Sequence, residues 1–146
     1  MFRTTQAFID RLESDGLKYK LLGKTHGGDE AVSLVFDGDE DAAELHLLCI
    51  FAQNGSRAAL RILRAVQVGE GKHLDAPIAL QDCNARYRFV KFCFPGEDER
   101  SVQMEMDVLF LPEMRPDLCA DLCVKGMQLM LSICAEAVPE LRQLLS

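Results

Sequence analysis

The sequence predicts an α+β domain, in which a twisted, mainly antiparallel sheet carries helices at the N-terminus, in the middle and at the C-terminus. Apolar residues recur at every second position in several segments, which is the pattern of half-buried strands. Other stretches repeat their apolar residues at helical spacing. Strands that follow one another without regular alternation with helices favour the α+β class. Because the 146 residues match the usual length of one domain, we expect residues 1–146 to form a single domain.

The N-terminal half begins with a helix and continues with strands. Residues 5–15 place Phe8, Ile9 and Leu12 on one helical face, and Gly16 follows where a helix commonly ends. Alternation of apolar and polar residues then predicts three strands, at positions 17–24, 32–36 and 45–51.

The segment 57–68 fits two interpretations. Its apolar residues match the period of a helix as well as that of a strand. The preceding Asn54-Gly55 pair is typical of a two-residue hairpin turn, since both turn positions need a positive φ. Such a turn joins two antiparallel strands, so we predict a fourth strand here.

The C-terminal half predicts a helix, a hairpin and a longer helix. The helix covers residues 75–84, and the hairpin pairs a strand at 86–94 with a strand at 101–111. Asp117 begins the last helix, which Pro139 is expected to kink or end, because proline removes a backbone hydrogen bond. We expect the first and last helices to cover one face of the sheet.

The charge of the chain is acidic and unevenly distributed. Sixteen Lys and Arg against 23 Asp and Glu give a net charge of −7. This balance disfavours nucleic acid as a partner, because phosphate binding needs clustered positive charge. Acidic residues dominate positions 29–44 and basic residues dominate positions 57–91, so the two blocks either face each other or lie in solvent.

The sequence predicts neither a membrane-spanning segment nor a secretion signal. The longest nearly unbroken apolar run, at positions 45–52, falls far short of the ~20 residues that cross a bilayer. The first fifteen residues carry several charges, unlike a signal peptide. We therefore expect a cytoplasmic protein without a membrane partner.

No motif in the chain pairs a nucleophile with a base, so we expect no enzyme activity and no cofactor. The six cysteines contain no C-x-x-C pair and are expected to be reduced core thiols without a metal. Among them, Cys119 and Cys123 should be the most reactive, because they lie in the first turns of the last helix. The alternative is a metal- or redox-responsive sensor or enzyme that uses the acidic loop 37–44 and the cysteines.

The order of elements around residues 74–110, "LDAPIALQDCNARYRFVKFCFPGEDERSVQMEMDVLF", resembles the YbjN family and the related type III secretion chaperones. The resembling features are a helix ending in Asn84, a strand directly after it, an acidic turn and an alternating strand. The resemblance implies a small acidic α+β protein that forms homodimers and has no catalytic site. The chaperone branch binds an extended segment of a secreted effector, whereas the YbjN branch is linked to regulation and stress.

These observations lead to one expected function and two sets of candidate residues. We expect a chaperone-like or regulatory protein-binding module that holds an extended segment of a partner protein. The candidate partner groove, where the first helix meets the sheet, consists of Phe8, Leu12, Leu34 and Phe36. The candidate homodimer interface, on the middle helix and the strand after it, consists of Leu80, Cys83, Tyr87 and Phe89.

Overall fold

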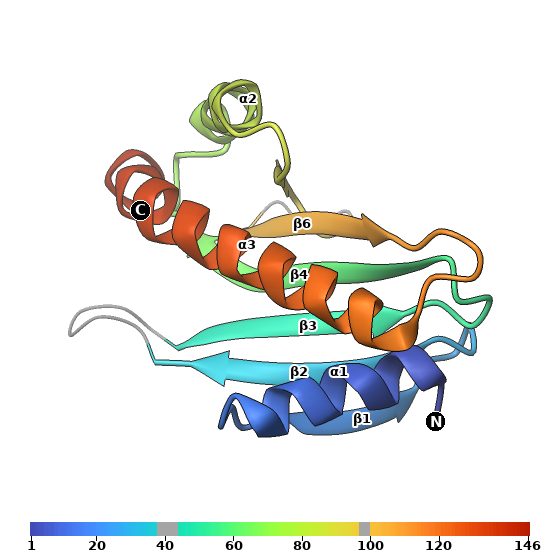
Figure 1. Ribbon diagram of the computed structural model, residues 1–146. Helices are drawn as coiled ribbons and strands as arrows, with labels where there is room; N and C mark the ends of the chain where they lie inside the picture. Colours follow the sequence, from blue (N-terminus) through green and yellow to red (C-terminus); the bar gives the residue numbers. More distant parts are fainter. Residues whose placement is uncertain (38–43, 97–99) are drawn as a thin grey trace. The chain divides into compact units, whose positions relative to one another are not determined.

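The computed structural model describes residues 1–37, 44–96 and 100–146. Its elements follow the predicted order. They are α1 (Arg3–Ser14), β1 (Lys20–Lys24), β2 (Glu30–Phe36), β3 (Leu45–Phe51), β4 (Arg57–Gln67), α2 (Asp75–Arg86), β5 (Lys91–Cys93), β6 (Ser101–Leu109) and α3 (Pro116–Leu145). The strands form a six-stranded sheet in the order β1-β2-β3-β4-β6-β5 (Figure 1). The pairs β1–β2, β2–β3 and β5–β6 are antiparallel, and the α+β class is confirmed.

The chain forms two compact units, each built from separate stretches of sequence. Unit 1 contains Met1–Leu60 and Asp107–Met127, and unit 2 contains Arg61–Met106 and Gln128–Ser146. The elements β4, β6 and α3 each begin in one unit and end in the other. Neither unit is a contiguous piece of chain, and the single domain stays a prediction.

In unit 1, α1 and the first part of α3 lie on the same face of the sheet (Figure 1). Phe8 of α1 is fully buried, and its ring centroid lies 5.4 Å from that of Phe51 on β3. At the surface, Arg11 of α1 forms an ion pair with Asp121 of α3. The apolar stripe of α1 therefore packs onto the apolar face of the strands, as the helical spacing predicts.

The contested segment is a strand. β4 covers Arg57–Gln67, close to the predicted range 57–68. Arg64 within it has a φ of 51°, a left-handed conformation that interrupts the alternation of buried and exposed residues, so that Ala65 and Val66 are both buried.

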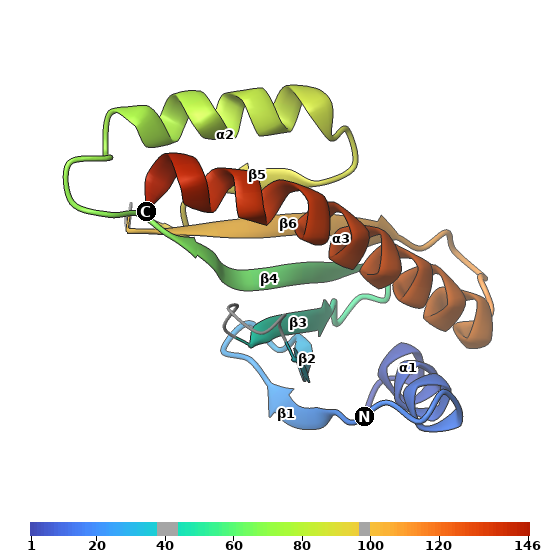
Figure 2. The same ribbon diagram turned by 90° about the vertical axis from the view of Figure 1, so that its left-hand side faces the viewer.

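In unit 2, α2 lies beside the last turns of α3 (Figure 2). The side of α2 that is buried carries Ala76, Leu80 and Cys83. The helix ends at Arg86, where it forms an ion pair with Glu140 of α3 at 3.1 Å. Hydrophobic burial on one side and this ion pair at the end hold α2 in its place.

The strand predicted at 86–94 is wrong in length, because β5 covers only Lys91–Cys93. Residues 87–90 instead connect α2 to β5. The side chain of Asn84 holds the short strand at Phe92. Its Nδ2 donates to the carbonyl oxygen of Phe92 at 3.0 Å, and its Oδ1 accepts the N–H of Phe92 at 2.6 Å. A side chain thus satisfies backbone groups that a neighbouring strand would otherwise pair.

The last helix does not end at Pro139, one of the two outcomes expected there, but continues to Leu145. By length and composition α3 could cross a membrane, since one stretch of it has a mean hydropathy of 1.5. The sequence interpretation considered only unbroken apolar runs and missed this stretch. A buried core helix passes the same test, and Met130, Ala137 and Leu141 of α3 are buried, so the observation is weak support for a membrane span.

Candidate functional site

A hollow of about 610 Å³ lies between α2 and the last turn of α3, within unit 2. We call it the α2–α3 groove. Its lining combines an apolar floor with charged and polar side chains. The lining residues are Lys72, Asp75, Ile78, Ala79, Asp82, Gln143 and Leu144.

The spacing of residues on α2 explains which of its side chains line the groove. Asp75, Ile78, Ala79 and Asp82 occupy positions i, i+3, i+4 and i+7, so they share one face of the helix. Ile78 is 70% exposed, although isoleucine is among the residue types most often fully buried. Leu144 on the opposite wall is 51% exposed. The groove therefore presents aliphatic surface that no part of the described chain covers.

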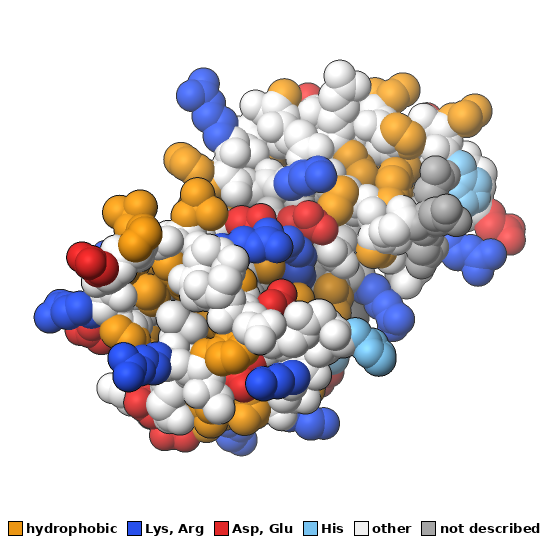
Figure 3. Space-filling view, turned by 90° about the vertical axis from the view of Figure 1, so that its right-hand side faces the viewer, with side chains coloured by type: hydrophobic (Ala, Val, Ile, Leu, Met, Phe, Trp, Pro, Cys, Tyr) orange, Lys and Arg blue, Asp and Glu red, His pale blue; other side chains and the backbone are white. Residues whose placement is uncertain are grey.

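Exposed apolar side chains also occur elsewhere. Leu109, the last residue of β6, and Leu111, just after the strand, are about as exposed as Ile78. On the side of the molecule in Figure 3, hydrophobic side chains lie in separate groups with charged side chains between them. Scattered exposure of this kind is normal for protein surfaces. The α2–α3 groove differs because its exposed aliphatic side chains line a hollow.

The charges of the groove are mainly acidic. Asp75 and Lys72 form no ion pair within the part of the chain that the structure describes. Asp82 lies 3.3 Å from Arg86, which also pairs with Glu140 at 3.1 Å. Two carboxylates against one ammonium leave the lining with a net negative charge.

Gly69 lets the chain before α2 approach the end of α3. Its N–H donates to the carbonyl oxygen of Leu145 at 2.7 Å. A Cβ at position 69 would lie 2.9 Å from the backbone carbon of Ser146, closer than real Cβ contacts. This close approach brings the segment that precedes Lys72 against the last turn of α3, next to the groove.

Gly69→Ala is therefore expected to destabilise the protein by about 1–3 kcal/mol, because the end of α3 must shift to admit the methyl group. The free energy of unfolding is measured by urea denaturation. Gly27→Ala is the matched control, since a Cβ there meets only the Thr25 hydroxyl, at 4.0 Å. Equal stability of the two variants would contradict the close approach at Gly69.

The predicted partner groove is not open in this structure. Phe8, Leu12 and Leu34 have at most 1% of their surface exposed, and only Phe36 is half-buried. Phe8 of α1 instead packs against Phe51 of β3, with ring centroids 5.4 Å apart. The three buried side chains belong to the core of unit 1 and offer no surface to a partner.

The predicted dimer residues divide into two pairs. Leu80 and Cys83 are buried on the inner side of α2, so they contribute no accessible surface. Tyr87 and Phe89 lie in the connection between α2 and β5 rather than on a strand. Tyr87 packs against Phe92 with ring centroids 5.9 Å apart, whereas Phe89 is 73% exposed. Of the four, Phe89 is the residue free to contact another molecule.

The groove residues themselves were missed by the sequence interpretation. It used the apolar stripe of α2 that is buried, and it left Ile78 without a role. The available signal was that Leu74 and Ile78 are large apolar residues outside this stripe. No pattern in the sequence indicates that Gln143 and Leu144 line the groove, since only the fold brings them beside α2.

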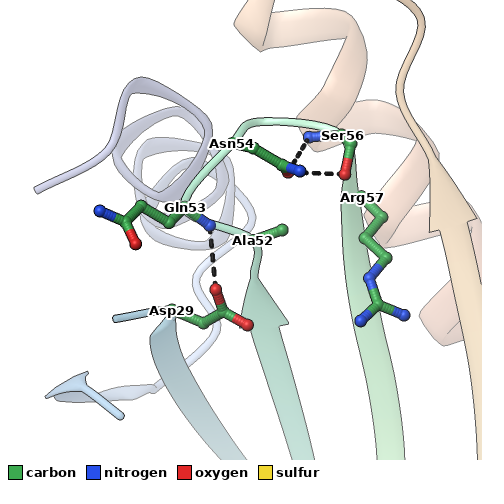
Figure 4. Close-up of a pocket in the computed structure, with 6 residues that line it drawn as sticks. All are labelled: Asp29, Ala52, Gln53, Asn54, Ser56 and Arg57. Atoms are coloured by element: carbon green, nitrogen blue, oxygen red, sulfur yellow. Dashed lines mark hydrogen bonds between the residues drawn. The ribbon is translucent and has the colours of Figure 1, made fainter. Parts of the chain in front are cut away.

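A second hollow, of about 370 Å³, lies at the turns of unit 1 and is polar (Figure 4). The carboxylate of Asp29 accepts the backbone N–H of Gln53 at 3.0 Å. The side-chain oxygen of Asn54 accepts hydrogen bonds from the N–H and the hydroxyl of Ser56. These polar groups stabilise the β3–β4 turn, which accounts for their presence without a ligand.

Two arginines of the basic block pair with carboxylates that lie outside the acidic block. Arg57 and Arg61 on β4 form ion pairs with Asp107 and Glu105 on β6. The acidic loop of the sensor hypothesis, at 37–44, lies outside the described residues except for Asp37 and Glu44. Within the described ranges, no group of three or more His, Cys, Asp or Glu side chains is placed to hold a metal ion.

The thiols are buried except for one. Cys119 and Cys123, expected to be the most reactive, are 2% and 0% exposed, and burial raises the pKa of Cys119. Cys93 on β5 is half-buried, and this partial burial also raises the pKa of its thiol. The position of Cys119 and Cys123 near the start of α3 thus matters less than their burial against the sheet.

We expect Cys93 to be the first cysteine that iodoacetamide alkylates in the native protein, and the buried cysteines to react only after unfolding. The measurement is mass spectrometry of proteolytic fragments after timed labelling. Alkylation of Cys119 or Cys123 at the rate of Cys93 would contradict the burial seen at the start of α3.

Comparisons with known proteins support the fold and no more. The chain has a YbjN-like α+β fold, which confirms the resemblance in the sequence. Its elements follow the order helix, four strands, helix, two strands and helix, and the strands form one six-stranded sheet. The similar solved structure is the crystal structure of YbjN from E. coli, described as a candidate transcription regulator. It aligns with a TM-score of 0.62 at 14% identity, covering 97% of this chain and 95% of that chain. No family model and no curated protein matches this chain.

Proposed function

We propose that the protein is a non-catalytic protein-binding module, regulatory or chaperone-like, that holds an extended segment of a partner protein in the α2–α3 groove. The observation that carries this proposal is the exposed aliphatic lining of the groove, above all Ile78 at 70% exposure. Burial of such a side chain by a partner contributes about 1.5–3 kcal/mol.

The regulatory role described for YbjN from E. coli is compatible with this proposal, with protein rather than nucleic acid as the partner. The net charge of −7 opposes binding to phosphates. Three arginines of the basic block, Arg57, Arg61 and Arg86, have carboxylate partners within the protein. A cytoplasmic location and the absence of a cofactor remain part of the proposal.

Photo-crosslinking tests the proposal in the cells that make the protein. A photoreactive amino acid replaces Ile78 in one variant and Gln81 in another. Gln81 is exposed on the same helix but does not line the groove, so it is the matched control. A partner should crosslink at position 78 and much less at position 81.

The crosslinked partner is then purified and its affinity measured by calorimetry. Ile78→Asp should weaken binding at least about tenfold, since it places a charge in an apolar contact, and Gln81→Asp should change it less than about twofold. A partner whose affinity is insensitive to Ile78→Asp would contradict the proposal.

We also expect a homodimer, with Phe89 in its interface. Phe89 is 73% exposed beside the half-buried Tyr87, and a second copy would cover it. Light scattering at tens of micromolar should give the mass of a dimer for the natural sequence and of a monomer for Phe89→Asp. A monomer mass for both proteins would reject the dimer without affecting the groove.

A further inference from the structure

We propose that the segment bound in the α2–α3 groove is basic as well as apolar, with two Lys or Arg residues that contact Asp75 and Asp82 on either side of aliphatic residues. This inference deepens the proposed function and rests on it.

The charge of the groove determines which sign of charge the bound segment carries. Asp75 has no ion-pair partner in the described part of the chain, so its charge is available. Asp82 shares Arg86 with Glu140, and Arg86 therefore keeps one carboxylate if Asp82 binds another cation. Lys72 is the one basic residue in the lining and does not offset both carboxylates. An acidic segment would meet two like charges, which weakens its binding.

The spacing of the two carboxylates sets the spacing of the basic residues. Asp75 and Asp82 are separated by seven positions on α2, and a helix rises about 1.5 Å per residue, so their backbones lie roughly 10 Å apart along the axis. An extended chain rises about 3.3 Å per residue. Two basic residues about three to four positions apart therefore match Asp75 and Asp82, and the residues between them lie over Ile78.

Two fluorescein-labelled peptides test the inference by anisotropy. Their centres read Lys-Leu-Val-Leu-Lys and Glu-Leu-Val-Leu-Glu, with identical flanking residues. At low ionic strength the lysine peptide should bind about tenfold more tightly than the glutamate peptide, because two attractive pairs replace two repulsive ones. A third peptide has the same residues as the lysine peptide in scrambled order. It measures binding that depends on net charge alone, and this binding should be weak.

Neutralising variants locate the effect in the groove. Asp75→Asn with Asp82→Asn should reduce the preference for lysine to less than about threefold. The matched control, Asp10→Asn with Asp117→Asn, removes the same net charge from unit 1, at a site distant in sequence from the groove, and should keep most of the preference. Circular dichroism establishes that each variant is folded. In the natural protein, nuclear magnetic resonance shifts on adding the lysine peptide should concentrate at residues 72–82 and 143–144.

Several results would overturn the inference. They are equal affinity for both peptides, a preference that survives neutralisation of Asp75 and Asp82, shifts outside the groove, or a dimer that Ile78→Asp converts to a monomer. The last result would mean that a second copy occupies the groove. A natural partner that crosslinks at position 78 while the peptides show no charge preference would overturn the basic chemistry and leave the proposed function standing.

Discussion

Phe8→Ala is expected to destabilise the protein by about 3–5 kcal/mol, the largest effect of any single change considered for this protein. The side chain is fully buried, and its ring lies 5.4 Å from that of Phe51. Truncation to alanine removes the ring that α1 inserts against β3 and leaves a cavity that the neighbouring strands fill only in part. Urea denaturation followed by circular dichroism measures the loss.

Phe89→Ala is the matched control for this change, because it deletes the same side chain at a position that is 73% exposed. Measured on the monomer at low protein concentration, it should change the free energy of unfolding by less than about 0.5 kcal/mol. A small effect of Phe8→Ala would restore the interpretation in which Phe8 lines an open groove, whereas a large effect places it in the core.

Alkaline pH is expected to destabilise the protein through its buried thiols. Burial raises the pKa of Cys134 from its ordinary value to about 11 in the folded protein, and burial also raises the pKa of Cys49. Between about pH 9 and pH 11 the unfolded chain loses a proton from Cys134 that the folded protein retains. Stability is therefore complete below about pH 9 and falls as the pH rises, by about 2–3 kcal/mol from Cys134 alone at about pH 11.

The measurement compares the free energy of unfolding at about pH 8 and about pH 10.5 in the natural protein and in Cys134→Ala. The variant is less stable at the lower pH because it loses buried contacts, but its stability should fall less between the two pH values. The same pH dependence in both proteins would show that the thiol of Cys134 does not titrate as its burial implies.

The sequence predicts the strands well where one face is buried and the backbone is regular. In β3, the buried residues Leu47, Cys49 and Phe51 alternate with more exposed neighbours, and the predicted range 45–51 is confirmed. Period-two alternation reports which side of a strand is apolar. It does not report what covers that side, which is why Phe8 and Leu34 were assigned to a groove rather than to the core.

The failures occur where a single side chain or a distant segment decides the structure. The hydrogen bonds of Asn84 to the backbone of Phe92 tie the end of α2 to β5, and no periodic pattern reveals them. The α2–α3 groove needs residues 72–82 and 143–144 together. In the sequence, the only sign of its apolar lining was that Ile78 lies outside the buried stripe of α2. Its second wall, formed by α3, depends on the tertiary fold.

The edge strand β1 has a consequence for the solubility of the protein. Strands at the edge of a sheet can recruit further strands and seed fibrils. β1 begins at Lys20 and ends at Lys24, and its register shifts between Leu21 and Gly23. The two ammonium groups and the irregular backbone oppose the addition of a strand in register. Amyloid-like stacking through this edge is thereby disfavoured.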